Sequence, residues 1–102
     1  MIYTIIPTKF LLEQIKELDD KTKGIISNKK ELIKINPFRY KKIHSKSYRH
    51  VFSVKLTPER KAKRLIYIVL KEVIFLCFIL DRDKEYKDLE KYFKKVEKEI
   101  IS

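Results

Sequence analysis

Four residues in the second half of the chain are of the types that bind a phosphate group: Lys55, Arg64, Arg82 and Tyr86. Arginine presents a planar fork of N–H donors that suits phosphate oxygens, and it stays charged at any working pH. Lysine can transfer a proton, and tyrosine can stack on a base or orient a hydroxyl group. These residues form one site only if the fold brings them together.

The second of two predicted β-hairpins brings two of these cations to one end of a sheet. If its turn is centred on Lys71, Arg64 lies across from Phe78, and Arg82 falls just beyond the strand end on the same side. Tyr86 follows Arg82 by four residues, which is one turn of a helix that starts by residue 83. A slip of one residue would turn these side chains to the opposite face.

The first predicted hairpin adds Lys55 to the group. A turn centred near Glu59 places Lys55 directly across from Arg64. Natural sheets avoid like charges directly across strands, so a convergence of cations favours an anionic ligand such as phosphate. In the alternative interpretation Tyr86 only packs on a helix face, and the cations extend into water or pair with the nearby carboxylates of Asp81, Asp83 and Glu85.

Other residues with possible chemistry carry weaker signals. His44 falls in a loop and His50 on an apolar face, where lone histidines are more often structural than catalytic. Tyr67 alternates with Arg64 and is expected in the core. No metal site is expected, because the acidic residues at 81, 83 and 85 fit the start of a helix, whose dipole favours negative charge.

The chain is strongly basic, with a net charge of +11 over 102 residues. Residues 37–64 hold 10 of the 25 basic residues and 1 of the 14 acidic ones, so most of the excess lies there. Such concentration favours a surface that binds a nucleic-acid backbone, with Phe38, Tyr40 and Tyr48 available to stack on bases. The alternative is a solvated face that only confers solubility. The candidate RNA-binding cations are Arg39, Lys41, Lys42, Lys46, Arg49, Arg60 and Lys63.

These residues must be positioned by a single domain over residues 1–102, since a chain of this length holds one core. Alternating or continuous apolar residues predict four strands, the last of them central: Ile2–Ile6, Tyr48–Leu56, Arg64–Leu70 and Val73–Leu80. Apolar spacings of three and four predict a helical hairpin and a C-terminal helix through Ile100. The order indicates an α+β fold with an antiparallel sheet of three or four strands.

The connections between these elements are also predicted. Thr8 can cap the first helix, and the polar run 19–24 separates it from a second helix that ends at Asn36–Pro37. Phe38–Ser47 is expected to be an extended loop, and Lys71–Glu72 a tight turn. Asp81 and the next two residues can cap the last helix.

Several absences narrow the class of protein. Cys77 is the only cysteine, so no intramolecular disulfide and no zinc site built from cysteines can form. The first ten residues lack the pattern of a secretory signal, and the longest apolar run is roughly half of what a membrane-spanning helix needs. The sequence predicts a cytoplasmic protein with no membrane partner.

The order of elements and four stretches of sequence resemble the RelE-like branch of the RelE/ParE superfamily of bacterial and archaeal toxins. These stretches are the loop NPFRYKKI, the strands VFSVKL and KRLIYIV, and the segment VIFLCFILDRDKEY. The resemblance covers most of the chain. It implies the toxin of a type II toxin–antitoxin system that cleaves messenger RNA in the ribosomal A site. It implies no metal and no cofactor, and the expected partners are the ribosome, messenger RNA and a cognate antitoxin.

The resemblance also implies roles for single residues. Lys55 matches a basic strand residue and is the candidate for proton transfer, Arg64 and Arg82 match phosphate-binding arginines, and Tyr86 matches a C-terminal tyrosine. Ser53 departs from the pattern, since many relatives have a second catalytic lysine or arginine there, and no histidine follows Arg82. Two alternatives stay open: a ParE-like toxin that inhibits DNA gyrase without nuclease activity, and an RNA-binding homologue with weak catalysis.

Overall fold

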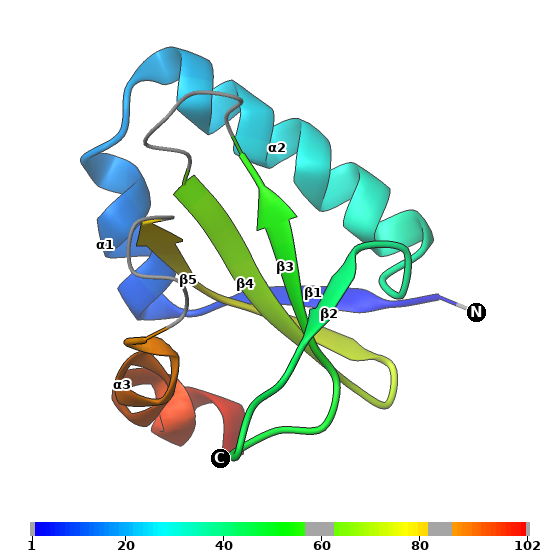
Figure 1. Ribbon diagram of the computed structural model, residues 1–102. Coiled ribbons are helices and arrows are strands. Elements are labelled where there is room, and N and C mark those ends of the chain that lie inside the picture. Colours follow the sequence, from blue (N-terminus) through cyan, green and yellow to red (C-terminus); the bar gives the residue numbers. More distant parts are fainter. Residues whose placement is uncertain (1, 57–62, 82–86, 102) are drawn as a thin grey trace.

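The computed structural model describes residues 2–56, 63–81 and 87–101. These residues form an α+β fold in which helices lie on both sides of a five-stranded sheet (Figure 1). In chain order the elements are β1 (Thr4–Pro7), α1 (Lys9–Lys16), α2 (Asp20–Ile35), β2 (Lys41–Ile43), β3 (Val51–Lys55), β4 (Lys63–Leu70), β5 (Val73–Asp81) and α3 (Leu89–Ile101). No helix of the described ranges is long and apolar enough to cross a membrane.

The strand order across the sheet is β1-β5-β4-β3-β2. β5 lies between β1 and β4, which confirms that it is a central strand. The predicted α+β class is confirmed, but the sheet is mixed and has five strands rather than being antiparallel with three or four. β1 pairs with β5 in parallel, and residues 41–43 of the predicted loop form the fifth strand, β2, because Ile43 is buried and its backbone pairs with Val51.

Each face of the sheet carries its own apolar core. The α2 face is covered by α1 and α2 and buries alternate residues of β3 and β4 together with Leu11 and Ile33, among them Phe52, Val54, Leu65 and Tyr67. The α3 face is covered by α3 and buries the other alternate set, among them Val51, Ile66, Ile68 and Phe78. Burial on both faces explains why β4 and β5 read as nearly continuous apolar runs.

Capping residues set where the first two helices begin. The Thr8 side chain accepts a hydrogen bond from the backbone N–H of Leu11 at 3.0 Å, which confirms the predicted cap. Asp19 accepts one from the N–H of Thr22 at 2.7 Å and so starts α2. The run 19–24 is therefore the beginning of α2 rather than a break. The break is the shorter segment 17–19, because the carboxylate of Asp19 satisfies an otherwise unpaired N–H group.

The hairpin of β4 and β5 turns at Lys71 and Glu72, as predicted. Leu70 pairs with Val73, and Lys71 takes a left-handed backbone with φ of 55°. β5 has a β-bulge. Ile66 pairs with Phe78 and Tyr67 pairs with Leu76, which leaves Cys77 of β5 as the extra residue. Cys77 is completely buried, and burial raises the pKa of its thiol, so it acts as a small apolar residue.

This turn and this bulge move the partner of Arg64. Arg64 lies opposite Leu80 and not opposite Phe78, so the predicted register was wrong by two residues. One residue of the shift comes from the two-residue turn and the other from the bulge. A shift of two residues keeps side chains on the same face, and Arg64 therefore stays on the predicted side of the sheet.

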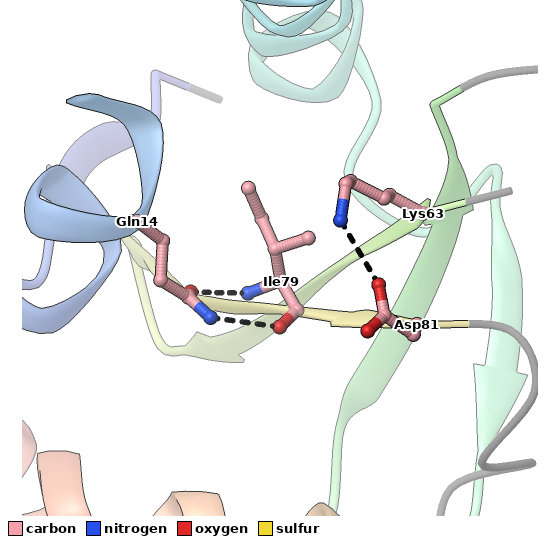
Figure 2. Close-up of polar contacts among 4 residues, drawn as sticks. All are labelled: Gln14, Lys63, Ile79 and Asp81. Carbon is pink, nitrogen blue, oxygen red and sulfur yellow. Dashed lines mark hydrogen bonds and ion pairs between the residues drawn. The ribbon is translucent and has the colours of Figure 1, made fainter. Parts of the chain in front are cut away.

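Beyond the end of β1, the side chains of Thr8 and Gln14 form hydrogen bonds with the backbone of β5. β1 pairs with β5 only as far as Leu76. Beyond that point the hydroxyl of Thr8 donates to the carbonyl of Cys77 at 2.6 Å. The amide of Gln14 then makes two hydrogen bonds with the backbone of Ile79, at 2.9 and 2.7 Å (Figure 2). These contacts satisfy buried backbone groups that would otherwise have no strand partner.

The C-terminal helix docks as its periodicity predicts. Leu89, Phe93 and Val96 are all buried against the α3 face, and each should contribute roughly 1.5–3 kcal/mol. The Phe93 ring lies 4.9 Å from the ring of Tyr48 and 5.0 Å from that of Phe78, measured between centroids. It therefore connects α3 both to β5 and to the segment before β3.

Replacing Phe93 with alanine should lower the free energy of unfolding by roughly 3–5 kcal/mol, because a fully buried ring is lost and a cavity remains. Denaturant titration followed by circular dichroism measures this value. Lys94→Ala is the matched control, since Lys94 is exposed on the same helix. An unchanged midpoint for Phe93→Ala would show that α3 does not hold the sheet in solution.

Candidate phosphate-binding site

Three cross-strand rows of side chains on the α3 face pass from apolar to cationic. The first row contains Ile43, Val51, Ile68 and Phe75. The second contains Lys41, Ser53, Ile66 and Phe78. The third contains Lys55, Arg64 and Leu80. The apolar members of the first two rows pack in the α3 core, while the third row brings two cations side by side at the end of the sheet.

The central prediction of the sequence analysis, that Lys55 lies opposite Arg64, is confirmed. The Leu56 N–H also donates to the carbonyl of Lys63 at 2.8 Å, which extends the same register by one residue. Side chains directly opposite each other have Cβ atoms about 5 Å apart. Lys55 is exposed and Arg64 is partly exposed, so a ligand in solution can reach both.

Three of the predicted site residues, Arg60, Arg82 and Tyr86, lie outside the described residues, as do Asp83 and Glu85 of the alternative interpretation. Of the carboxylates proposed there as partners, Asp81 belongs to β5 and forms an ion pair at 3.0 Å with Lys63 (Figure 2). Lys63 lies on the α2 face with Leu65, so this ion pair is on the side of the sheet opposite to Lys55 and Arg64.

The ion pair of Lys63 and Asp81 borders a cleft of about 280 Å³ between α1, α3 and the ends of β4 and β5. Gln14 and Tyr92 also line the cleft. The carboxylate of Asp81 neutralises Lys63, so Lys63 is a weak candidate for RNA binding. In the described ranges, no group of three or more histidine, cysteine, aspartate or glutamate side chains could hold a metal ion.

The predicted basic surface is divided between the two faces of the sheet. Lys41 and Lys42 are neighbours on β2, but Lys41 lies opposite Ser53 on the α3 face and Lys42 opposite Phe52 on the α2 face. Both side chains are exposed. The other described cations of the loop, Arg39, Lys46 and Arg49, are exposed as well.

The aromatic residues proposed for base stacking are separated in the same way. Phe38 is half exposed and contacts the edge of Phe52, whose side chain belongs to the α2 core. Tyr40 also packs against that core, and the cations of Lys29 and Arg39 lie 5.8 and 5.7 Å from its ring centroid. Tyr48 is partly buried against Phe93 of α3, and none of the three extends freely beside Lys55.

The contacts of His50 and Tyr67, two of the weaker catalytic candidates, are with aromatic rings and with the backbone of the fold. His50 is partly buried, and its ring lies 5.8 Å from that of Phe38, whereas His44 is exposed. Tyr67 is fully buried and its hydroxyl donates to the carbonyl of Pro37 at 2.5 Å, so its expected place in the core is confirmed. Burial raises the pKa of Tyr67 and keeps it a neutral donor.

The fold of this chain also occurs in a solved toxin structure. A double arginine-to-alanine mutant of the E. coli toxin RelE in the free state matches 99% of this chain and 100% of its own, with a TM-score of 0.70 and 16% sequence identity. The chain has a RelE-like fold. A scan against protein-family models finds no match, and neither does a search of curated proteins.

A polar clamp between the loop after β2 and the first turn of α3 was missed in the sequence. The hydroxyls of Ser45 and Ser47 donate to the carboxylate of Glu90 at 3.2 and 2.7 Å, and the backbone N–H of Lys46 donates at 3.1 Å. Partial burial alone would raise the pKa of Glu90, but these hydrogen bonds outweigh it and lower the pKa below its usual value. The clamp fixes the β2–β3 connection on α3. The alternation of Ser45, Lys46 and Ser47 was its only signal.

The lowered pKa of Glu90 makes the clamp dependent on pH. Its stabilisation should be fully present above the ordinary glutamate pKa of about 4.3 and be lost as pH falls through the lower pKa of the folded state. Glu90→Gln should therefore be less stable than wild type at pH 7, by about 1 kcal/mol because solvent still reaches the carboxylate. Thermal melts at a series of pH values should show this difference shrinking in acid.

Glu97→Gln is the control for the clamp, because Glu97 is an exposed carboxylate of the same helix. It should follow the wild-type pH profile. A difference between wild type and Glu90→Gln that stays constant down to the acid transition would contradict the clamp.

Proposed function

We propose that this chain is the toxin of a type II toxin–antitoxin system and that it cleaves messenger RNA on the ribosome. The observation that carries the proposal is the pairing of Lys55 with Arg64 at the open end of the α3 face. Two cations held side by side at an exposed end of a sheet suit the oxygens of a phosphate group. The RelE-like fold supports the same class of protein, since the solved structure that shares it is a toxin.

The proposed reaction needs no metal. The 2′-oxygen of a nucleotide attacks the adjacent phosphorus, so the bond from phosphorus to the 2′-oxygen forms while the bond to the 5′-oxygen of the next nucleotide breaks. The 2′-hydroxyl proton passes to a base, and an acid protonates the departing 5′-oxygen, which leaves with the bonding electrons. The products are a 2′,3′-cyclic phosphate and a 5′-hydroxyl end.

The described side chains suit two parts of this reaction. Arg64 donates hydrogen bonds to phosphate oxygens as negative charge builds on them, and Lys55 is the candidate for the proton transfer. From the resemblance, Arg82 adds a second phosphate contact and Tyr86 stacks on a base or orients the 2′-hydroxyl. The exposed loop cations supply the salt-dependent attraction to the RNA backbone.

The proposed substrate determines where the protein is expected in the cell and which partners it is expected to have. Ribosomes and messenger RNA place the protein in the cytoplasm, with no membrane partner and no cofactor. A small acidic or amphipathic antitoxin would restrain the toxin by covering the basic end of the sheet, since complementary charge steers such partners together.

A second candidate function is RNA binding with weak or no cleavage. The observation that favours it is Ser53, which stands where the resemblance leads one to expect a second catalytic cation. Ser53 is only 3% exposed and lies between Lys41 and Ile66 in the second row. A hydroxyl group in that place cannot compensate phosphate charge as a lysine does.

Primer extension on a message in a cell-free translation system tests the proposed cleavage. Wild type should cut the message only when ribosomes are present. Arg64→Ala should slow single-turnover cleavage about 100-fold, the usual loss for one donor to a developing oxyanion, and change ribosome affinity much less. The double variant Lys42→Gln with Lys46→Gln should do the reverse. It should weaken binding and flatten its salt dependence, while the rate at saturation is kept.

Lys34→Gln serves as the neutral control, because Lys34 is an exposed residue of α2 outside the predicted surface. If Arg64→Ala lost affinity and kept its single-turnover rate, Arg64 would be a docking residue and the RNA-binding function would replace the enzyme. Inhibition of DNA supercoiling by gyrase, without RNA cleavage, would identify the ParE-like alternative.

Growth measurements test the toxin and its partner together. High expression of wild type alone should arrest growth, and co-expression of the product of the adjacent gene should restore it, because the antitoxin would cover the cations that bind RNA. Arg64→Ala expressed to the same level should permit growth. Normal growth with folded wild-type protein at high level would remove the support for a toxin.

A further inference from the structure

The edge strand β2 places one further cation beside Lys55 and Arg64. Lys41 lies directly opposite Ser53, which precedes Lys55 by two residues on β3. Lys41 and Lys55 are therefore diagonal neighbours on the same face, which in an antiparallel pair lie about 7–8 Å apart, with their Cβ atoms somewhat closer. We propose that Lys41 contacts the same phosphate group as Lys55 and Arg64, an inference that rests on the proposed function.

Two anchors keep Lys41 on the sheet rather than on a flexible loop. Ile43, two residues along the same strand, is 9% exposed and packs in the α3 core. The clamp of Ser45 and Ser47 on Glu90 then holds the chain that follows. A cation on a strand fixed at this end is held in position by the sheet, and precise position is what a transition-state contact needs.

Ser53 leaves space for this arrangement. Its small side chain is buried between Lys41 and Ile66, at the boundary of the apolar and cationic rows. A long side chain at position 53 would compete with Lys41 for the surface over β3. The cation that Ser53 does not supply can thus come from the neighbouring strand, and the ammonium of Lys41 has three donors for phosphate oxygens.

Lys42 offers a matched comparison within the same strand. It carries the same charge, it is also exposed, and it differs in facing Phe52 on the opposite side of the sheet. Loss of either lysine should remove one backbone contact and reduce the salt dependence of binding to a similar extent. Loss of Lys41 alone should also remove a contact to the reacting phosphate.

The experiment is a pair of double-mutant cycles with Arg64→Ala, one with Lys41→Met and one with Lys42→Met. Methionine keeps most of the apolar stem that covers the sheet and removes the charge. Single-turnover cleavage on ribosomes is measured at saturation, and affinity is measured with a single-stranded RNA whose 2′-hydroxyls are methylated. Thermal melts establish that every variant is folded, and Lys34→Met is the neutral control.

We expect Lys41→Met to slow cleavage about 100-fold at saturation, and Lys41→Arg to retain most of the rate, because arginine also donates to phosphate. Lys41→Met and Arg64→Ala should be non-additive, as residues that share one ligand group are. Lys42→Met and Arg64→Ala should be additive. Equal behaviour of the two lysines in both cycles would overturn the role of Lys41, while cleavage by wild type would still stand.

The affinity cycle separates this inference from the proposed function. If wild type cleaved no message, the nuclease would be refuted, and the methylated RNA would still report on the shared phosphate. Coupling between Lys41 and Arg64 in affinity would then support a phosphate site without catalysis. Additivity there would refute the shared contact as well.

Discussion

The antiparallel pairing of β3, β4 and β5 inside two apolar cores is the constraint on which the candidate site depends. From Leu65 to Val69 the residues of β4 alternate between the α2 core and the α3 core. A slip by one residue would exchange the side chains that fill the two cores and would turn Arg64 to the α2 face, so the close packing of both cores specifies the register. This commitment fixes Arg64 on the α3 face, and the pairing of β3 with β4 then fixes Lys55 beside it.

The bulge on β5 changes which of its side chains face each core. Without it the side chains of β5 past Leu76 would alternate with the opposite parity, and Ile79 would turn away from the α2 core. With Cys77 inserted, Phe78 and Leu80 face α3 and contribute to its core. Gln14 hydrogen-bonds the backbone of β5 on the edge that β1 leaves, so β5 can continue to Asp81 with β4 as its strand neighbour on one side only.

Most elements of the fold could be predicted from the sequence, because a strong apolar periodicity specifies both whether a segment is a helix or a strand and which of its faces is buried. The alternation in β3 and β4 and the spacing of α3 identified those elements, and the pairing of Lys55 with Arg64 followed from that alternation together with a turn centred near Glu59. β2 could not be found in this way. Of its three residues only Ile43 is buried, so it has no pattern of its own and exists through pairing with β3. The same holds for the parallel direction of β1, which only the tertiary fold decides.

The failure to predict β2 explains why Lys41 was classed with the loop cations. Charge counted along the chain cannot distinguish Lys41 from Lys42, whereas one residue of strand alternation sends them to opposite faces. The predicted aromatic residues divide in the same manner, with Phe38 and Tyr40 beside the α2 core and Tyr48 beside α3. A basic segment therefore contributes to function only through the few cations that the sheet turns toward one place. In this fold that place is the end of the α3 face, where the apolar rows give way to Lys55 and Arg64.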